Sequence, residues 1–146
     1  MAFSDERQDK FGELLISVLK NNALSWFDVK CSGEGPSPQD RIAYQHLSQL
    51  PAETVEVIKD SVNDVISNSI YDLLEKLQQL WEDGGGVELL IDGTNIFEIN
   101  DEVKMNLFGE DRWEAKFGKY PSADQLGEKY DKWYNKLRRE GKIDDK

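Results

Sequence analysis

The sequence predicts a single compact, mainly α-helical domain of five or six helices, with one long central helix and one small β-hairpin near residues 87–99. Apolar residues recur every three or four positions over most of the chain, as they do along one face of a helix. Alternation of apolar and polar residues, typical of a half-buried strand, is confined to one short stretch. With 146 residues, the chain has the usual size of one domain, so residues 1–146 are interpreted as one unit.

The first helix is predicted to begin after Ser4, an N-cap residue followed by two acidic residues in the first turn. It is expected to end near Asn21 and Asn22. The segment from Leu24 to Val29 fits either a helix or a strand and stays unassigned. The apolar positions of this first helix keep helical spacing: Phe11, Leu14, Leu15, Val18 and Leu19.

A flexible loop is expected at about residues 31–37, because glycine, proline and serine crowd together there and break regular structure. Ser37 can then cap a second helix that has Pro38 at its first position. The inner face of this second helix is predicted to consist of four residues: Ile42, Ala43, His46 and Leu47.

The central helix is predicted from Pro51 to Trp81, where apolar residues keep helical spacing throughout. A continuous helix of this length spans about 45 Å at 1.5 Å per residue. That is long for a compact domain, so a break near residues 67–69 remains an alternative. A glycine-rich turn at residues 84–86 is expected to end the helix, because consecutive glycines disfavour regular structure.

The hairpin is predicted from the apolar residues Val87, Leu89 and Ile91, a turn at residues 92–95, and a second strand at residues 96–99. Two short helices follow in the prediction. The first starts at Asn100 or Asp101 and stops at Gly109, and the second starts at residue 110 or 111 and stops at residue 118. The last helix begins at a capping box formed by residues 122–125 and runs to residue 141.

The charge of the chain is uneven. Residues 1–118 carry 23 acidic and 10 basic side chains, whereas residues 119–146 carry 6 and 8. The net charge of −11 opposes binding to nucleic acid or an anionic membrane, since both are polyanions.

The apolar runs are much shorter than the roughly 20 residues of a membrane helix, and no basic export signal precedes an apolar core. We therefore expect a cytoplasmic protein whose partner is another protein, with a basic partner favoured.

Candidate chemistry in the sequence is sparse. His46 is the only histidine and is interpreted as structural, and the single cysteine, Cys31, excludes an intrachain disulfide and is interpreted as incidental. Residues 92–95 resemble the start of a calcium loop, but Phe97 occupies the position that requires glycine. The basic last helix also carries aromatic rings, yet these fall at core spacing. We predict no catalytic residues, metal site, cofactor or nucleic-acid partner.

The function predicted from these observations is that of a small acidic, non-enzymatic protein-binding module. Its most concrete form is an inhibitor or immunity-type protein for a basic partner such as a toxin or nuclease, because carboxylates can occupy sites meant for phosphate. Two alternatives remain open: a histidine-independent enzyme that uses a carboxylate cluster, and a homo-oligomeric accessory or structural protein that associates through the long helix. The predicted interface lies in the acidic span 82–114 and consists of Glu98, Asp101, Glu102, Glu110, Asp111 and Trp113. Whether the aromatic residues of segment 108–134 belong to the core or to an interface is left open.

Overall fold

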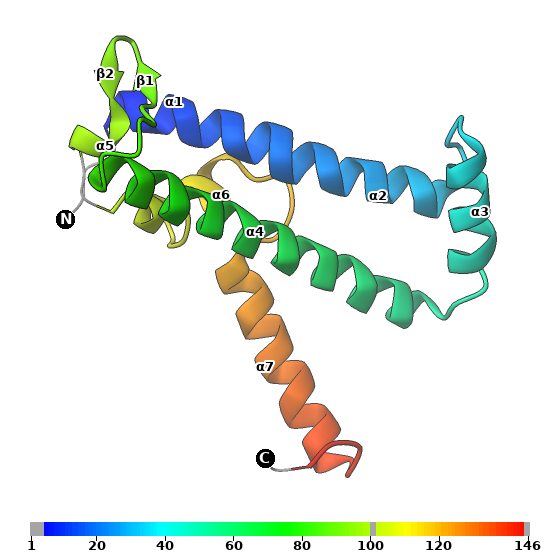
Figure 1. The fold of residues 1–146 in the computed structure, drawn as a ribbon. Coiled ribbons are helices and arrows are strands. Elements are labelled where there is room, and N and C mark those ends of the chain that lie inside the picture. The colour runs from blue at the N-terminus through cyan, green and yellow to red at the C-terminus, as the bar shows by residue number, and fades with distance from the viewer. Residues whose placement is uncertain (1–4, 100–101, 145–146) are drawn as a thin grey trace.

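The computed structural model describes residues 5–99 and 102–144, which are mainly helical (Figure 1). Three successive helical segments form one long rod: α1 (Glu6–Leu15), the π-helix η1 (Ile16–Asn21) and α2 (Asn22–Ser32). Helix α3 (Pro38–Leu47) lies across the far end of this rod, and α4 (Ala52–Glu82) returns beside it. The rod and α4 therefore form a long antiparallel helical hairpin that α3 closes at one end.

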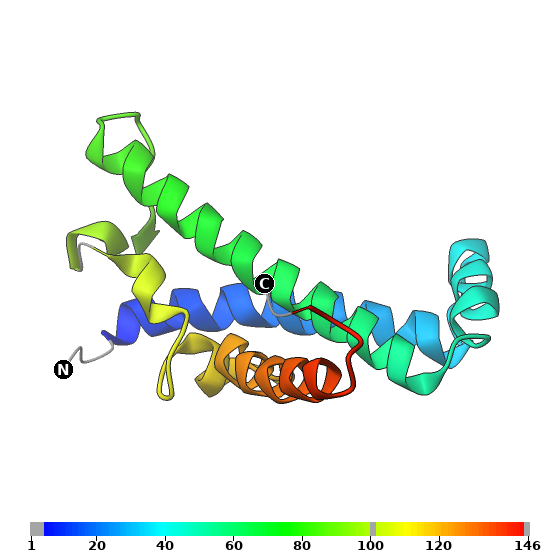
Figure 2. The ribbon, with the colours of Figure 1, turned by 90° about the horizontal axis from the view of Figure 1, so that it is seen from below.

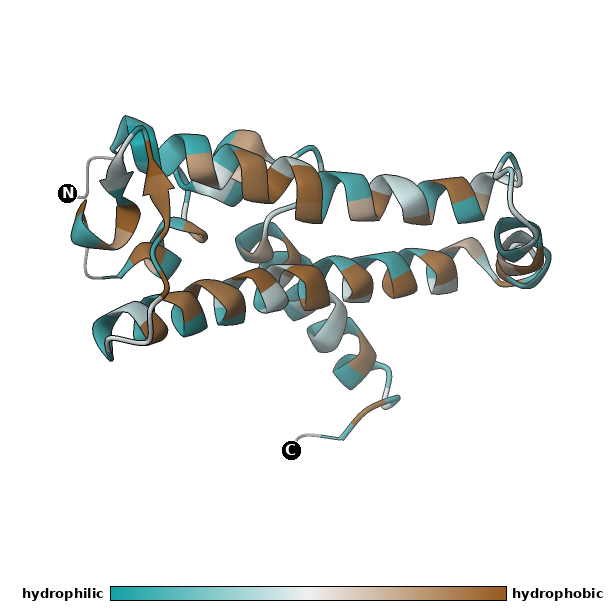
Figure 3. Ribbon diagram, turned by 45° about the horizontal axis from the view of Figure 1, so that its top comes forward, coloured by the Kyte–Doolittle hydropathy of each residue, from teal (hydrophilic) through white to brown (hydrophobic). Residues whose placement is uncertain are grey.

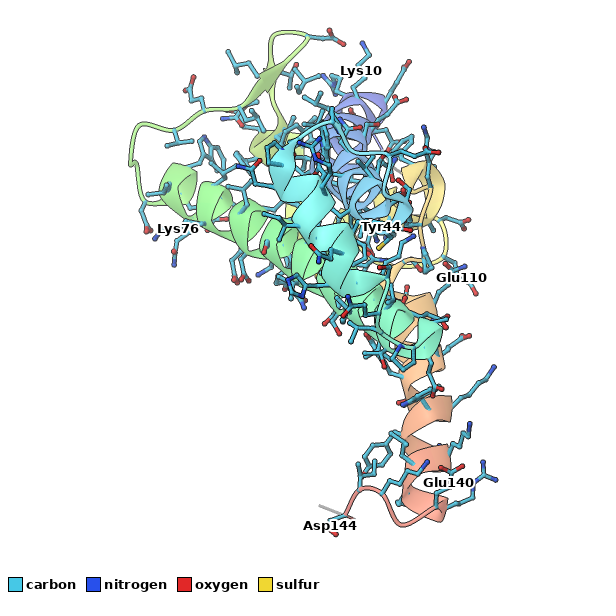
Figure 4. The ribbon with its side chains drawn as sticks, turned by 90° about the vertical axis from the view of Figure 1, so that its right-hand side faces the viewer. Lys10, Tyr44, Lys76, Glu110, Glu140 and Asp144 are labelled. Atoms are coloured by element: carbon cyan, nitrogen blue, oxygen red, sulfur yellow. The ribbon has the colours of Figure 1, made fainter. Side chains whose placement is uncertain are left out.

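The remaining elements gather at the opposite end of the helical hairpin. Strand β1 (Leu90–Ile91) pairs antiparallel with β2 (Thr94–Asn95), and α5 (Ile96–Ile99), the 3-10 helix η2 (Val103–Asn106) and α6 (Trp113–Phe117) follow. Helix α7 (Ala123–Arg139) then leaves the body (Figures 1 and 4). With the rod counted as one helix, the described residues hold six helices, so the predicted mainly α fold with a long central helix and a small β-hairpin is confirmed.

The predicted end of the first helix near Asn21 and Asn22 is wrong. The π-helix η1 carries the chain through this point, where the N–H of Asn22 bonds to the carbonyl of Ser17. A π-turn holds one residue more than an α-turn, so it turns extra side chains inward without ending the helix. The unassigned segment from Leu24 to Val29 is helical. The N-cap of the rod is Asp5, whose carboxylate accepts the N–H of Arg7, while the predicted cap Ser4 lies outside the described residues.

The second helix begins as predicted, with Pro38 in its first turn and a capping box between Ser37 and Asp40. Its predicted inner face is wrong for Ile42 and His46, which are exposed, whereas Ala43 and Leu47 are half-buried. Helix α3 instead meets the rod through Asp40, which is buried and pairs with Lys30 of α2 at 2.8 Å. The helix is thus attached by an ion pair at its first turn.

Helix α4 is continuous, so the break considered near residues 67–69 does not occur. Ser67 is fully buried, and the hydroxyl of Ser69 donates to the carbonyl of Val65 at 2.8 Å, which leaves the helical backbone intact. The length that seemed excessive for a compact domain suits this molecule because the rod and α4 make it elongated (Figure 2).

The β-hairpin is shorter than predicted. Asp92 and Gly93 both have positive φ, as a two-residue type I′ turn requires, but β2 ends at Asn95. The side-chain oxygen of Asn95 accepts the N–H of Phe97 at 3.1 Å, which starts the helical turn α5 where a strand was expected. Ile96 and Phe97 are consequently both buried, whereas successive strand residues would point to opposite faces.

The short helices after the hairpin also differ from the prediction. The first of them is the 3-10 helix η2 and ends at Asn106, and its two predicted starting residues, 100 and 101, lie outside the described part of the chain. Helix α6 begins later than predicted, at Trp113, and ends at Gly118 as expected. Helix α7 has the predicted capping box between Ser122 and Gln125.

The hydrophobic core lies where the hairpin, η2 and α6 meet the two long helices. The rod, α4, α5, η2, the residue after η2 and α6 each contribute to it. Its buried members are Phe11, Leu15, Ile16, Ile70, Leu74, Ile96, Phe97, Val103, Leu107 and Trp113. The core thus occupies one end of the molecule.

Trp113 is a core residue, with 1% of its surface exposed. Its ring lies directly against Gly12 of α1 and meets the ring of Phe11 edge-to-face at 6.2 Å between centroids. The indole N–H donates to a carboxylate oxygen of Asp9 at 3.1 Å, so the buried polar atom of the ring is paired. The contact depends on a residue without a side chain at position 12.

Gly12→Ala is expected to destabilise the protein by about 1–3 kcal/mol, because overpacking forces neighbouring groups to move. The added methyl group would stand 2.2 Å from the Trp113 ring. Urea unfolding followed by circular dichroism measures the change. Gly127→Ala in α7 is the control: its methyl group would meet nothing within 4 Å, so this change should stabilise the helix by about 0.5–1 kcal/mol. Equal effects at the two positions would contradict the packing described here.

Candidate functional site

The structure distributes the predicted interface residues over several elements. Glu98 lies on α5, Glu102 precedes η2, and Glu110 and Asp111 lie in the turn before α6; all four are exposed. Asp101 lies outside the described residues. The sixth predicted residue, Trp113, belongs to the core, so its ring does not reach the surface in this structure.

Glu102 borders a surface hollow of about 230 Å³ between the last turns of α4 and η2. Lys104 pairs with Glu75 across this hollow at 2.7 Å. The side chain of Gln78 donates to Glu82 at 2.9 Å and accepts the N–H of Val103, so it joins α4 to η2. In this hollow, Glu102 of the predicted interface therefore lies near two carboxylates of α4, Glu75 and Glu82.

A second polar group is entirely enclosed. Lys20 of η1 and Glu114 of α6 form an ion pair at 2.8 Å, and their side chains are 0% and 1% exposed. The hydroxyl of Ser67 on α4 donates to the same carboxylate oxygen at 2.5 Å. Three elements that are distant in sequence thus meet at one buried carboxylate.

This buried network also holds the start of α7. The second carboxylate oxygen of Glu114 accepts the N–H of Ala123, the first residue of α7, at 2.7 Å. The carbonyl of Pro121, just before the helix, accepts hydrogen bonds from Lys20 at 3.0 Å and from Asn63 at 2.9 Å. A negative charge at a helix N-terminus is favourable, so Glu114 both pairs with a lysine and caps a helix.

The buried carboxylates are paired with lysines and not with each other. Besides Glu114, Asp40 bonds Lys30 at 2.8 Å and Asp60 bonds Lys129 of α7 at 2.5 Å. Hydrogen bonds from Lys30 and Ser37 lower the pKa of Asp40 to about 2. A general acid in an enzyme instead needs a raised pKa, so this pairing favours a structural role.

The other chemical candidates lie apart from these groups. His46 is exposed on α3, and Cys31 is half-buried near the end of α2, where burial raises the pKa of its thiol and disfavours the reactive thiolate. Within residues 5–99 and 102–144, histidine, cysteine and acidic side chains form no group of three that could hold a metal ion.

The largest unexpected feature is an uncharged ridge on the outer side of α4. We use the term α4 ridge for the residues at four-residue intervals Val57, Ser61, Val65, Ser69 and Leu73. Its three apolar members expose 37%, 62% and 42% of their surface. They point away from the core, because the buried positions of α4 lie on the opposite side of the helix: Asp60, Asn63, Ser67, Ile70, Leu74 and Gln78.

The α4 ridge borders a shallow apolar hollow of about 350 Å³. Every side chain that lines this hollow is uncharged, and the six residues are Val57, Ile58, Ser61, Val62, Val65 and Ile66. The Ser61 and Ser69 hydroxyls donate to the carbonyls of Val57 and Val65, each at 2.8 Å. The polar hydrogens of the ridge are therefore satisfied within α4 itself.

The rod adds exposed apolar side chains of its own. Figure 3 shows hydrophobic positions recurring along both long helices between the β-hairpin at one end and α3 at the other. The exposed apolar residues of the rod are Leu14, Val18, Leu19 and Trp26. Exposed apolar surface of this extent commonly marks a site of protein interaction.

The sequence analysis missed both the buried ion pair and the ridge. It treated all apolar residues of the central helix, Val65 and Leu73 among them, as one pattern at helical spacing. The available signal was the width of that pattern, since apolar residues there cover more than one face of the helix. For Lys20 and Glu114 the signal was weaker: Lys20 directly follows the apolar stripe of the first helix, and Glu114 directly follows Trp113.

Comparison with known proteins gives no further guide. No protein-family model matches the chain, and no curated protein or solved structure matches it either. None of the helices in the described residues combines the length and hydrophobicity needed to cross a lipid bilayer. The functional argument therefore rests on the surfaces described above.

Lys20→Met is expected to destabilise the protein by about 3–5 kcal/mol, because it leaves the Glu114 carboxylate buried without its cation. The double variant Lys20→Met/Glu114→Gln should regain much of this loss, since both charges are then absent. Thermal and urea unfolding measure the three proteins. Lys10→Met, which removes the exposed pair with Asp92, serves as the control and should leave stability close to wild type. If Lys20→Met proves as stable as Lys10→Met, the structural role of the buried pair is contradicted.

The Tyr120 hydroxyl donates to Asp28 at 2.7 Å, and burial together with this bond raises the pKa of Tyr120 from 10.0 to about 12. The unfolded chain therefore loses this proton first as the pH rises. The contribution of Tyr120 to stability is complete below pH 10 and is lost between pH 10 and 12. Phenolate absorbance should show a late-ionising tyrosine that Tyr120→Phe removes. An unchanged titration in the variant would contradict the assignment.

Proposed function

We propose that this chain is a small, acidic, non-enzymatic protein-binding module whose contact surface is the α4 ridge and the hollow beside it. The observation that supports this proposal most directly is the absence of charge along the ridge. Charged residues make up 32% of the chain, yet the five ridge residues and the six hollow residues are all uncharged. The centres of protein interfaces are likewise depleted of charged residues.

The contacts that hold α4 in place also make the α4 ridge suitable for binding a partner. Helix α4 is held on its inner side by the core, by the buried Glu114 network and by Lys129 of α7. A surface carried by a rigid helix loses little conformational entropy when a partner docks. Apolar side chains at regular helical spacing are the form in which helical surfaces recognise partners.

A second candidate is an inhibitor or immunity-type protein that captures a basic partner. The observation that favours it is the exposure of Glu98, Glu102, Glu110 and Asp111 on a chain of net charge −11. Such carboxylates accelerate association with a basic surface by long-range attraction. The acidic hollow that Glu102 shares with Glu75 and Glu82 is where a basic side chain of that partner would dock.

The binding proposal predicts that Val65→Asp abolishes capture of a partner protein without unfolding the chain. Val65 is 62% exposed, so the substitution leaves the core intact, but it places a charge at the centre of the proposed interface. Affinity capture from the native lysate with quantitative mass spectrometry compares it with wild type. Met105→Asp is the matched control, because Met105 is 52% exposed on η2 and lies outside the α4 ridge. Equal loss in both variants, or in neither, would argue against the ridge.

The basic-partner candidate predicts a different pattern. The variant Glu98→Gln/Glu110→Gln/Asp111→Asn should bind its partner more weakly and with a flatter dependence on salt, because fewer charges attract the basic surface. Salt-gradient elution of the captured partner measures this change. Wild-type elution from the triple variant would remove the candidate.

A further inference from the structure

We propose that the partner of the α4 ridge is a second copy of this chain, whose own α4 packs antiparallel across it about a two-fold axis near Val65. This inference rests on the proposed function, because it names the occupant of the same surface. It follows from the symmetry of the ridge, from its hydrogen bonding and from the absence of charge on its five residues.

The α4 ridge reads the same in both directions from Val65. A serine lies four residues away on each side, Ser61 and Ser69, and an apolar residue lies eight away on each side, Val57 and Leu73. In an antiparallel two-fold contact centred on Val65, each residue faces the position equally far on the other side of the centre. Ser61 then faces Ser69 of the second copy, and the two Val65 side chains meet at the axis. The two-fold contact thus places apolar side chains on apolar ones and serines on serines.

The spacing also fixes how two such helices cross. Residues at intervals of four form a ridge inclined to the helix axis, and two helices that pack such ridges together cross at about −50°. The serines on either side of Val65 are small, so the two backbones meet only small side chains next to the crossing point. The crossing point falls near the middle of α4, which runs from Ala52 to Glu82.

The hydrogen bonding of the ridge allows it to leave water at little cost. Burial of an unpaired hydroxyl is unfavourable, but the Ser61 and Ser69 hydroxyls already donate to carbonyls within α4. A two-fold axis also places each central residue opposite its own copy, so a charged centre would repel itself. The five ridge residues meet this requirement, and the exposed carboxylate of Asp72 lies beside them, directly before Leu73.

The available area suits a weak dimer. The three exposed apolar side chains of the α4 ridge present on the order of 200 Å² at their exposed fractions, against about 800 Å² per partner in a standard interface. They are Val57, Val65 and Leu73.

Charge gives the dimer a characteristic salt dependence. Each copy carries −11, so two copies repel each other, and added salt should strengthen the dimer by screening that repulsion. A complex with a basic partner responds in the opposite direction. The sign of the salt effect therefore separates the two kinds of partner.

The test is the mass of the full chain by light scattering over a series of protein and salt concentrations. The wild type should reach twice the 16.8 kDa of one chain, with more dimer at higher salt. Val65→Asp should remain at 16.8 kDa with an unchanged circular dichroism spectrum, and Met105→Asp should behave as wild type. A wild type that stays monomeric throughout, or a dimer that persists in Val65→Asp, overturns the inference.

A disulfide cross-link tests the register. In a Cys31→Ser background, Val65→Cys should oxidise to a covalent dimer, because the two positions meet at the axis, while Leu73→Cys should not. Cross-linking at Leu73 and not at Val65 would overturn the proposed axis. If the chain is monomeric yet captures a different protein that Val65→Asp no longer binds, the inference fails and the proposed function stands. If the chain is monomeric and Val65→Asp captures the same proteins as the wild type, the inference and the proposed function both fail.

Discussion

The fold depends on the ion pair between Lys20 and Glu114, which are 0% and 1% exposed. Two charges removed from water must be paired and fully hydrogen-bonded, and here the carboxylate accepts from a lysine, a serine and the first N–H of α7. These bonds tie η1, α4, α6 and α7 to one point. The core fills one end of the helical hairpin, and this polar junction joins α6 and the start of α7 to the two long helices.

The elongated shape explains why one side of the molecule is left uncovered. The rod and α4 are each longer than the group of short elements that packs against them, and the core formed with those elements occupies one end. Among the residues that the structure describes, no element covers the outer side of α4 along its middle, where Val65 lies. A chain with 29 acidic residues has ample charge for a solvated surface, yet it has none on the α4 ridge. The surface is therefore suited to contact with protein.

Much of the fold could be predicted because it depends on local rules. The capping boxes at Ser37 and Ser122, the long helix and the Asp92–Gly93 turn all follow from short-range hydrogen bonding and periodicity. The predictions that failed depend on tertiary contacts. The π-turn η1 carries Lys20, whose partner lies 94 residues away in the sequence, so no local pattern indicates it. The burial of Trp113 depends on Gly12, and the ridge became recognisable only when the inner side of α4 was known.

The π-turn at η1 also determines how the chain tolerates changes in its length. Because such a turn absorbs one residue more than an α-turn, deleting a single residue within Ile16–Asn21 would restore regular helical winding and leave the two halves of the rod close to their present orientation. A deletion elsewhere in the rod has no such turn to absorb it and would rotate the two halves against each other by about 100°. The three glycines at residues 84–86 are exposed and join separate elements, so insertions there disturb no register. Among related chains, single-residue alignment gaps within the rod should therefore fall at η1, and longer ones in the glycine turn.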